Sequence, residues 1–105
     1  MTAEELNDTL ARGVPPRILD VRTAREFAEG HVPGAVNIPF NEVGARAGEL
    51  SAPRAARLVV YCGHGPRAWI AARALRRAGF TQLDYLKGHM AAWRRARLPE
   101  QVESP

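Results

Sequence analysis

The sequence contains one cysteine among its 105 residues. A single thiol cannot form an internal disulfide, so the disulfide-stabilised scaffolds of small secreted domains are excluded. No apolar run approaches the roughly 20 residues that a membrane-spanning helix needs. The first residues also lack the basic and apolar segments of a secretory signal. These absences predict a cytoplasmic protein with no membrane partner.

Lysine is almost absent, and arginine carries nearly all of the positive charge behind a net charge of +4. Six of these arginines fall near predicted helix ends, where cations complement the helix dipole: 73, 76, 77, 94, 95 and 97. Aromatic residues do not interleave with them as a base-stacking surface requires. We therefore expect no nucleic-acid partner, although the positive field favours the approach of small anions.

Length and composition fit one compact domain, because 46% of the residues are hydrophobic and 25% are charged. Turn and helix-cap signals divide the chain into helices at 3–12, 24–29, 41–50, 66–78 and 89–98, and strands at 17–21, 35–38, 58–61 and 82–86. Alternation of strands with helices predicts an α/β domain whose parallel sheet is covered on both faces. We place this domain at residues 1–99 and expect residues 100–105 to form a frayed, flexible tail.

The cysteine, Cys62, follows the apolar strand 58–61 and opens a short loop before the next helix. The loop continues with Gly63, His64, Gly65, Pro66 and Arg67. Backbone N–H groups at a helix N-terminus bind anions, and the same field favours a thiolate, which is the nucleophilic form of cysteine. Position thus favours Cys62 as a catalytic nucleophile, whereas composition alone would make it a small buried hydrophobe.

The other loop residues are candidates for binding an anionic substrate. Gly63 and Gly65 permit unusual backbone angles and close approach of a ligand, while Pro66 has no N–H to donate. His64 offers a donor, or a positive charge when protonated, but its position favours an exposed loop residue over a catalytic base. Arg67 has two open roles, which are contact with an oxyanion and an ion pair with a carboxylate that shapes the loop.

Asp20 and Arg22 end the strand 17–21 at the same predicted sheet edge as Cys62. We expect them to support the site, with Asp20 accepting loop N–H groups or pairing with Arg22 or Arg67. The simpler alternative for Asp20 is a cap on the following helix. His31 and His89 lie in turns, where we expect local packing or hydrogen bonds. The spacing of histidine and cysteine predicts no metal site.

Three groups of segments together resemble the rhodanese family. They are 18–22, 26–27 and 30–39 for its N-terminal signature, 60–62 with Gly65 and Arg67 for its active-site loop, and 86–93 for its C-terminal signature. The resemblance covers about residues 2–99 and implies a three-layer α/β/α fold with four to five short parallel strands. The chain departs from the family pattern at Gly63, Ala68 and His89, and it begins almost at the first helix, so the family's first edge strand is missing or minimal.

The resemblance implies a thiosulfate sulfurtransferase that works through a persulfide on Cys62 and needs no metal or organic cofactor. Thiosulfate or a related persulfide is the implied donor, and cyanide, a thiol or a sulfur-carrier protein is the implied acceptor. A sulfur-relay or regulatory binding module is the first alternative. Cysteine phosphatases and arsenate reductases are a weaker one, because their loop is one residue longer between cysteine and arginine.

Overall fold

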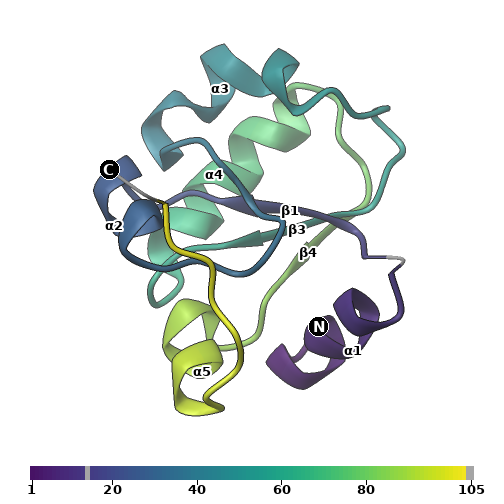
Figure 1. The fold of residues 1–105 in the computed structure, drawn as a ribbon. Helices are drawn as coiled ribbons and strands as arrows, with labels where there is room; N and C mark the ends of the chain where they lie inside the picture. The colour runs from purple at the N-terminus through teal and green to yellow at the C-terminus, as the bar shows by residue number, and fades with distance from the viewer. Residues whose placement is uncertain (14, 104–105) are drawn as a thin grey trace.

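The computed structural model describes residues 1–13 and 15–103, and its centre is a sheet of parallel strands (Figure 1). The strands are β1 (Arg17–Asp20), β2 (Val36–Asn37), β3 (Leu58–Tyr61) and β4 (Leu83–Tyr85). They form one four-stranded sheet in the order β2-β1-β3-β4. The predicted α/β class and parallel sheet are confirmed. Within residues 1–13 the chain starts with a helix, and no strand precedes it.

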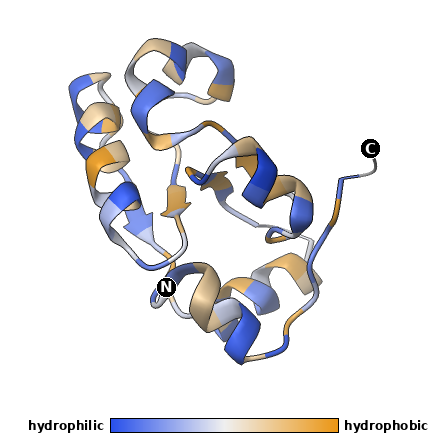
Figure 2. Cartoon of the chain, turned by 90° about the vertical axis from the view of Figure 1, so that its left-hand side faces the viewer, coloured by the Kyte–Doolittle hydropathy of each residue, from blue (hydrophilic) through white to orange (hydrophobic). Residues whose placement is uncertain are grey.

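Helices cover both faces of this sheet, which makes three layers (Figure 1). They are α1 (Ala3–Ala11), α2 (Ala24–Glu29), α3 (Val43–Arg46), α4 (Pro66–Arg77) and α5 (His89–Arg95). In Figure 1, α1 and α5 lie below the strands and α3 and α4 above them. Hydrophobic and hydrophilic residues alternate along the helices (Figure 2), as expected where one side of each is covered. Among the described residues, none of the helices has the length and apolar character needed to cross a bilayer.

Strand β3 contributes to the cores on both sides of the sheet, because successive side chains of a strand point to opposite faces. Leu58, Val60 and Cys62 belong to the core under α3 and α4. Val59 and Tyr61 belong to the core under α1 and α5. All five side chains are almost fully buried. The residue that follows this strand is therefore held against a packed core and directed toward α4.

Two predicted helix starts are confirmed in detail. Thr2 and Glu5 form a reciprocal capping box at α1, and Thr23 and Glu26 form another at α2. The helix expected over 41–50 is broken instead into a 3-10 turn at Phe40–Glu42, the short α3, and a second 3-10 turn at Ala47–Leu50. Gly44 and Gly48 lower the helix propensity of this stretch, and no side chain caps it.

The tail expected to fray is attached to the domain over its described part. His31 and Gln101 exchange two backbone hydrogen bonds of 2.9 Å in an antiparallel bridge. The Glu103 N–H donates to the Ala28 carbonyl at 3.0 Å, and the Gly34 N–H donates to the Gln101 side chain at 3.0 Å. His31 is buried, so its main-chain groups need partners, and the tail supplies them. Residues 104 and 105 lie outside the described part.

Candidate active site

The site is centred on Cys62, directly after β3 at the carboxyl edge of the sheet. Its thiol is buried, with the residue 1% exposed. The Gly65 N–H donates to the Cys62 Sγ at 3.0 Å. Of the amides expected to converge on the sulfur, this is the one that hydrogen-bonds to it in the described residues. An N–H aimed at sulfur from a helix start stabilises negative charge there.

The shape of the loop depends on its two glycines for different reasons. Gly65 immediately precedes α4 and has a φ of 137°, which side chains rarely allow. Gly63 needs space, because a Cβ there would lie 3.2 Å from the Arg67 guanidinium. Pro66 occupies the first turn of α4, as predicted, and its side chain is exposed. His64 is also exposed, at the outer side of the loop.

A pocket of about 240 Å³ opens beside the loop. Its charged lining consists of Arg22, Arg67, Arg94 and the acidic Glu26, together with His64. Gly63 forms part of its wall, so the pocket borders the loop that holds the nucleophile. The arginine side chains in this lining favour an anionic ligand.

Arg67 is tied to helix α2 by an ion pair. Its Nη1 and Nη2 atoms donate to the two carboxylate oxygens of Glu26 at 2.6 and 3.1 Å. Hydrogen bonding to Arg67 is the largest cause that lowers the pKa of Glu26 to about 2. The same bond raises the pKa of Arg67. Of the two roles left open for Arg67, the structure shows the ion pair that shapes the loop.

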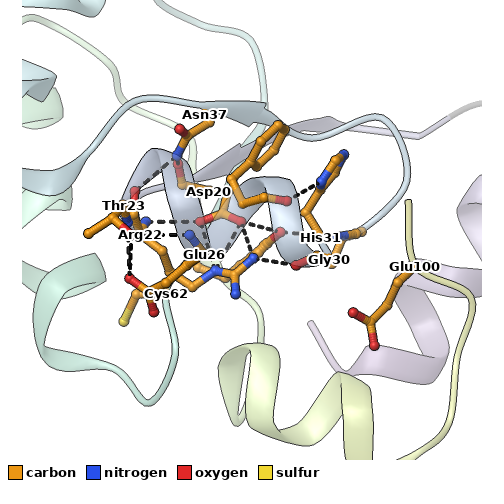
Figure 3. Close-up of polar contacts among 12 residues, drawn as sticks. Asp20, Arg22, Thr23, Glu26, Gly30, His31, Asn37, Cys62 and Glu100 are labelled. Carbon is orange, nitrogen blue, oxygen red and sulfur yellow. Dashed lines mark hydrogen bonds and ion pairs between the residues drawn. The ribbon is translucent and has the colours of Figure 1, made fainter. Parts of the chain in front are cut away.

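Asp20 and Arg22 form a buried network at the end of β1 (Figure 3). The Arg22 guanidinium donates to the Asp20 carboxylate at 2.7 Å and to the Gly30 carbonyl at 2.7 Å. Tyr61 donates its hydroxyl to Asp20 at 2.7 Å and accepts the Val32 N–H at 3.1 Å. Burial is the largest cause that raises the pKa of Tyr61, and the Asp20 charge raises it further.

This network lies on the side of the sheet opposite the thiol. Tyr61 belongs to the α1 and α5 core, whereas Cys62 belongs to the α3 and α4 core. As predicted, Asp20 thus pairs with Arg22, and in the described residues it receives no hydrogen bond from the cysteine loop. The alternative of a helix cap is wrong, because Thr23 caps α2. Arg22 alone of the two reaches the pocket.

Three residues in contact with the site were not predicted as site residues: Glu26, His89 and Arg94. Glu26 was interpreted as part of a capping box and of the family signature, although both of its carboxylate oxygens bind Arg67. His89 accepts the Cys62 N–H at its Nδ1 atom, at 3.2 Å. The signal that could have found His89 and Arg94 is topological. They belong to the helix after β4, and β4 lies beside β3 in the sheet.

Helix α5 also holds the loop through main-chain bonds. The Met90 N–H donates to the Cys62 carbonyl at 2.9 Å, and the Ala91 N–H donates to the Gly63 carbonyl at 3.2 Å. Carbonyl groups at the start of the loop are therefore turned toward α5. No group of three or more histidine, cysteine, aspartate or glutamate side chains in residues 1–13 and 15–103 is arranged to hold a metal ion.

Known proteins share this arrangement of elements. Residues 2–96 match the rhodanese-like domain family. A sulfurtransferase of Allochromatium vinosum is 32% identical over 97 residues, which cover 92% of this chain and 89% of that protein. Thiosulfate sulfurtransferase 16, a chloroplastic protein of Arabidopsis thaliana, is 35% identical over 97 residues, with 82% of this chain and 80% of that protein covered. The crystal structure of the Alr3790 protein of Anabaena sp. superposes with a TM-score of 0.88 at 31% identity, covering 100% of this chain and 94% of that one.

Proposed function

The chain belongs to the rhodanese-like domain family, and from that premise we propose that it transfers sulfur through a persulfide on Cys62. The proposed donor is thiosulfate or a related persulfide. The proposed acceptor is a thiophile, such as cyanide, a small thiol or a sulfur-carrier protein. Similarity to a sulfurtransferase and to a thiosulfate sulfurtransferase supports this chemistry.

The first half-reaction loads the enzyme. The Cys62 thiolate attacks the outer sulfur of thiosulfate and forms a new sulfur–sulfur bond. The bond between the two sulfur atoms of thiosulfate breaks, and sulfite leaves with its electron pair. A negatively charged persulfide remains on Cys62. No electron is gained or lost overall, because one sulfur atom moves from one nucleophile to another.

The second half-reaction returns the enzyme to its starting state. The acceptor attacks the terminal sulfur of the persulfide, and the Cys62 thiolate leaves with the electron pair. With cyanide the product is thiocyanate, and with a thiolate it is a new persulfide. Two successive displacements at one residue predict ping-pong kinetics.

The observation that carries this proposal is the Gly65 N–H, which donates to the Cys62 Sγ at 3.0 Å. The Cys62 Sγ bears the negative charge before loading, so this donor stabilises the attacking thiolate. The pocket beside the loop supports the choice of an anionic donor, because Arg22, Arg67 and Arg94 line it. Positive charge at the opening of this pocket raises the local concentration of small anions.

Access to the sulfur requires movement of the loop, because Cys62 is 1% exposed. The loop residues Gly63 and Gly65 are only partly buried, so the movement that exposes the thiol is expected in this loop. For each reagent we express the rate at Cys62 relative to its rate with a free thiol. We expect this relative rate to be much higher for the small iodoacetamide than for a bulky maleimide, and equal relative rates would contradict this view of access.

Mass spectrometry of the intact protein after thiosulfate treatment tests the proposed function. We expect one added sulfur atom on Cys62, which cyanide removes with release of thiocyanate. The Cys62→Ser variant is the control and should gain no sulfur. A wild-type protein that never gains sulfur from thiosulfate or from a small persulfide would overturn the proposal.

A further inference from the structure

His89 has a backbone conformation that side chains rarely adopt. Its φ is 55°, in the left-handed region, and it follows Gly88 with a φ of 71°. Residues other than glycine hold this conformation where surrounding contacts fix it, and such positions concentrate at functional sites. Its ring is partly buried against the cysteine loop. The contacts of the ring therefore need an explanation.

The ring of His89 binds Cys62 and lies close to Gly65, at the two ends of the segment 62–65. Its Nδ1 atom accepts the Cys62 N–H at 3.2 Å. Its Nε2 atom is 3.5 Å from the position that a Cβ on Gly65 would take. Cys62 bears the sulfur, and Gly65 supplies the N–H that binds it. One imidazole thus spans the two residues whose relative position sets the hydrogen bond to sulfur.

We propose that neutral His89 is a positioning residue for Cys62, and that protonation of its ring releases the loop and slows sulfur transfer. This role rests on the proposed function. Only a neutral imidazole has a nitrogen lone pair that can accept a hydrogen bond, because both ring nitrogens of the protonated form are donors. Protonated His89 would direct an N–H at the Cys62 N–H, and the contact would be lost.

The surroundings of His89 favour the accepting form. Burial is the largest cause that lowers the pKa of His89, and the nearby His64 lowers it further. Among the described residues, the titratable residues around the ring are Cys62, whose N–H it accepts, His64 from the loop, and Tyr85 from β4, whose ring centre is 6.2 Å away. The acceptor is therefore present near neutral pH and is lost as the pH falls through the pKa of His89.

Nuclear magnetic resonance tests the contact without any reaction. In the wild-type protein, we expect the Cys62 amide resonance to shift with the titration of the His89 ring nitrogens between pH 8 and pH 5. His89→Asn is the matched variant, because asparagine tolerates left-handed backbone and offers an oxygen acceptor that does not titrate. Its Cys62 amide should show no such step. A wild-type Cys62 amide that ignores His89 titration would overturn the proposal.

Single-turnover loading with thiosulfate tests the consequence. We expect the wild-type loading rate to fall with the same midpoint as the His89 titration, and His89→Asn to lose this dependence while staying within about threefold at pH 7. His89→Gly relieves the backbone but leaves the Cys62 N–H without its acceptor, so loading should slow by about tenfold.

The outcomes separate the two proposals. If His89→Asn and His89→Gly load at the same rate and both keep the wild-type pH profile, the ring only fills space and the role of His89 is overturned. If the wild-type protein takes up no sulfur at any pH, the proposed function fails. The resonance titration would still show whether His89 holds Cys62.

Discussion

The charges around the pocket are not equivalent, although three of them are arginines. Arg67 is neutralised by a bidentate pair with Glu26, and Arg22 by the buried Asp20. Arg94 is half exposed and meets Glu100 at 3.5 Å, which is a much looser pair. A guanidinium with a weak partner is the one most available to an incoming anion. The residue that recognises thiosulfate is therefore expected to be Arg94.

We expect Arg94→Ala to raise the KM for thiosulfate roughly threefold to tenfold with little change in kcat, as loss of uniform binding does. Arg95→Ala is the matched control, because it removes the same charge from the next position of α5 without lining this pocket. Arg67→Ala should lower kcat instead, since it detaches the loop from α2. Steady-state kinetics with cyanide as acceptor distinguish these effects. Identical behaviour of Arg94→Ala and Arg95→Ala would contradict the assignment.

Asp20 is expected to contribute stability rather than catalysis. It is fully buried and accepts hydrogen bonds from Arg22 and Tyr61. Asp20→Asn would leave the Arg22 charge buried without its counter-ion, which costs about 3 kcal/mol in the free energy of unfolding. Tyr61→Phe removes one neutral donor and should cost about 1 kcal/mol. Urea unfolding measures both, and an Asp20→Asn variant as stable as the wild-type protein would refute this account.

For single residues, the sequence predicted the features that depend on neighbours along the chain. Local sequence places Cys62 between an apolar strand and a helix that begins with proline, and the structure shows it between β3 and α4. His89 lies 27 residues from the cysteine whose amide it accepts. That contact exists because β4 pairs with β3, so the start of α5 is brought to the loop. No local pattern around His89 contains this information.

Helices α2 and α4 are connected by the Glu26 carboxylate, which makes two sets of hydrogen bonds. Glu26 closes the capping box at the start of α2 and also binds Arg67 in the first turn of α4. Helix α2 has no fully buried residue, so packing alone holds it weakly. Polar contacts at its N-terminus are therefore important for keeping it beside the active-site loop.

This coupling predicts a specific pH dependence. The folded protein lowers the pKa of Glu26 from 4.5 to about 2, chiefly by the hydrogen bond from Arg67. A lowered pKa means that the stabilisation is complete above about pH 4.5 and is lost as the pH falls toward 2. We expect Glu26→Gln to lower the Tm at pH 6 and to flatten the fall in Tm between pH 5 and 3.

Glu29→Gln is the control for that measurement, because it removes an equal charge from the same helix. Within the described part of the chain, Glu29 pairs only with the exposed Arg25, and it is itself 65% exposed. Its variant should keep the wild-type slope of Tm against pH. If Glu26→Gln and Glu29→Gln give the same slope, the pair between α2 and α4 does not carry the acid sensitivity.

Elements with a clear cap and a clear core face were predictable, and the segment 40–50 was not. The capping boxes of α1 and α2 are satisfied by side chains three residues apart, so local sequence determines them. In 40–50 the apolar anchors Val43, Ala47 and Leu50 fix the chain to the α4 side of the sheet. Packing at these anchors, rather than helix propensity, sets the backbone there, and short 3-10 turns result.

In the whole molecule, the first and the last described residues bind to segments that are distant in sequence. The Met1 ammonium group pairs with Asp84 and with the Tyr85 carbonyl, which ties the start of the chain to β4. The C-terminal residues run from α5 up to α2 (Figure 1) and pair with His31. Sequence patterns assigned these last residues to a frayed tail, because a single antiparallel bridge leaves no periodic signal. The buried main chain of His31 and the bonds to Ala28 and Gly34 explain why the tail is bound.

Removal of residues 100–105 is expected to weaken the domain and its site together. The deletion breaks the two His31–Gln101 bonds and the Glu103–Ala28 bond, and we expect a loss of about 2 kcal/mol in the free energy of unfolding. Because Ala28 and His31 flank the Gly30 carbonyl that binds Arg22, loss of the tail should also loosen this wall of the pocket and raise the KM for thiosulfate.

Gln101→Ala separates the backbone contribution of the tail from that of its side chain. It keeps both main-chain bonds to His31 and loses only the bond to the Gly34 N–H. We expect it to cost less than half of what the deletion costs in urea unfolding. Hydrogen exchange at the His31 amide should accelerate only in the deletion, because the Gln101 carbonyl is its acceptor. A deletion variant with wild-type stability and a protected His31 amide would show that the tail does not bind in solution.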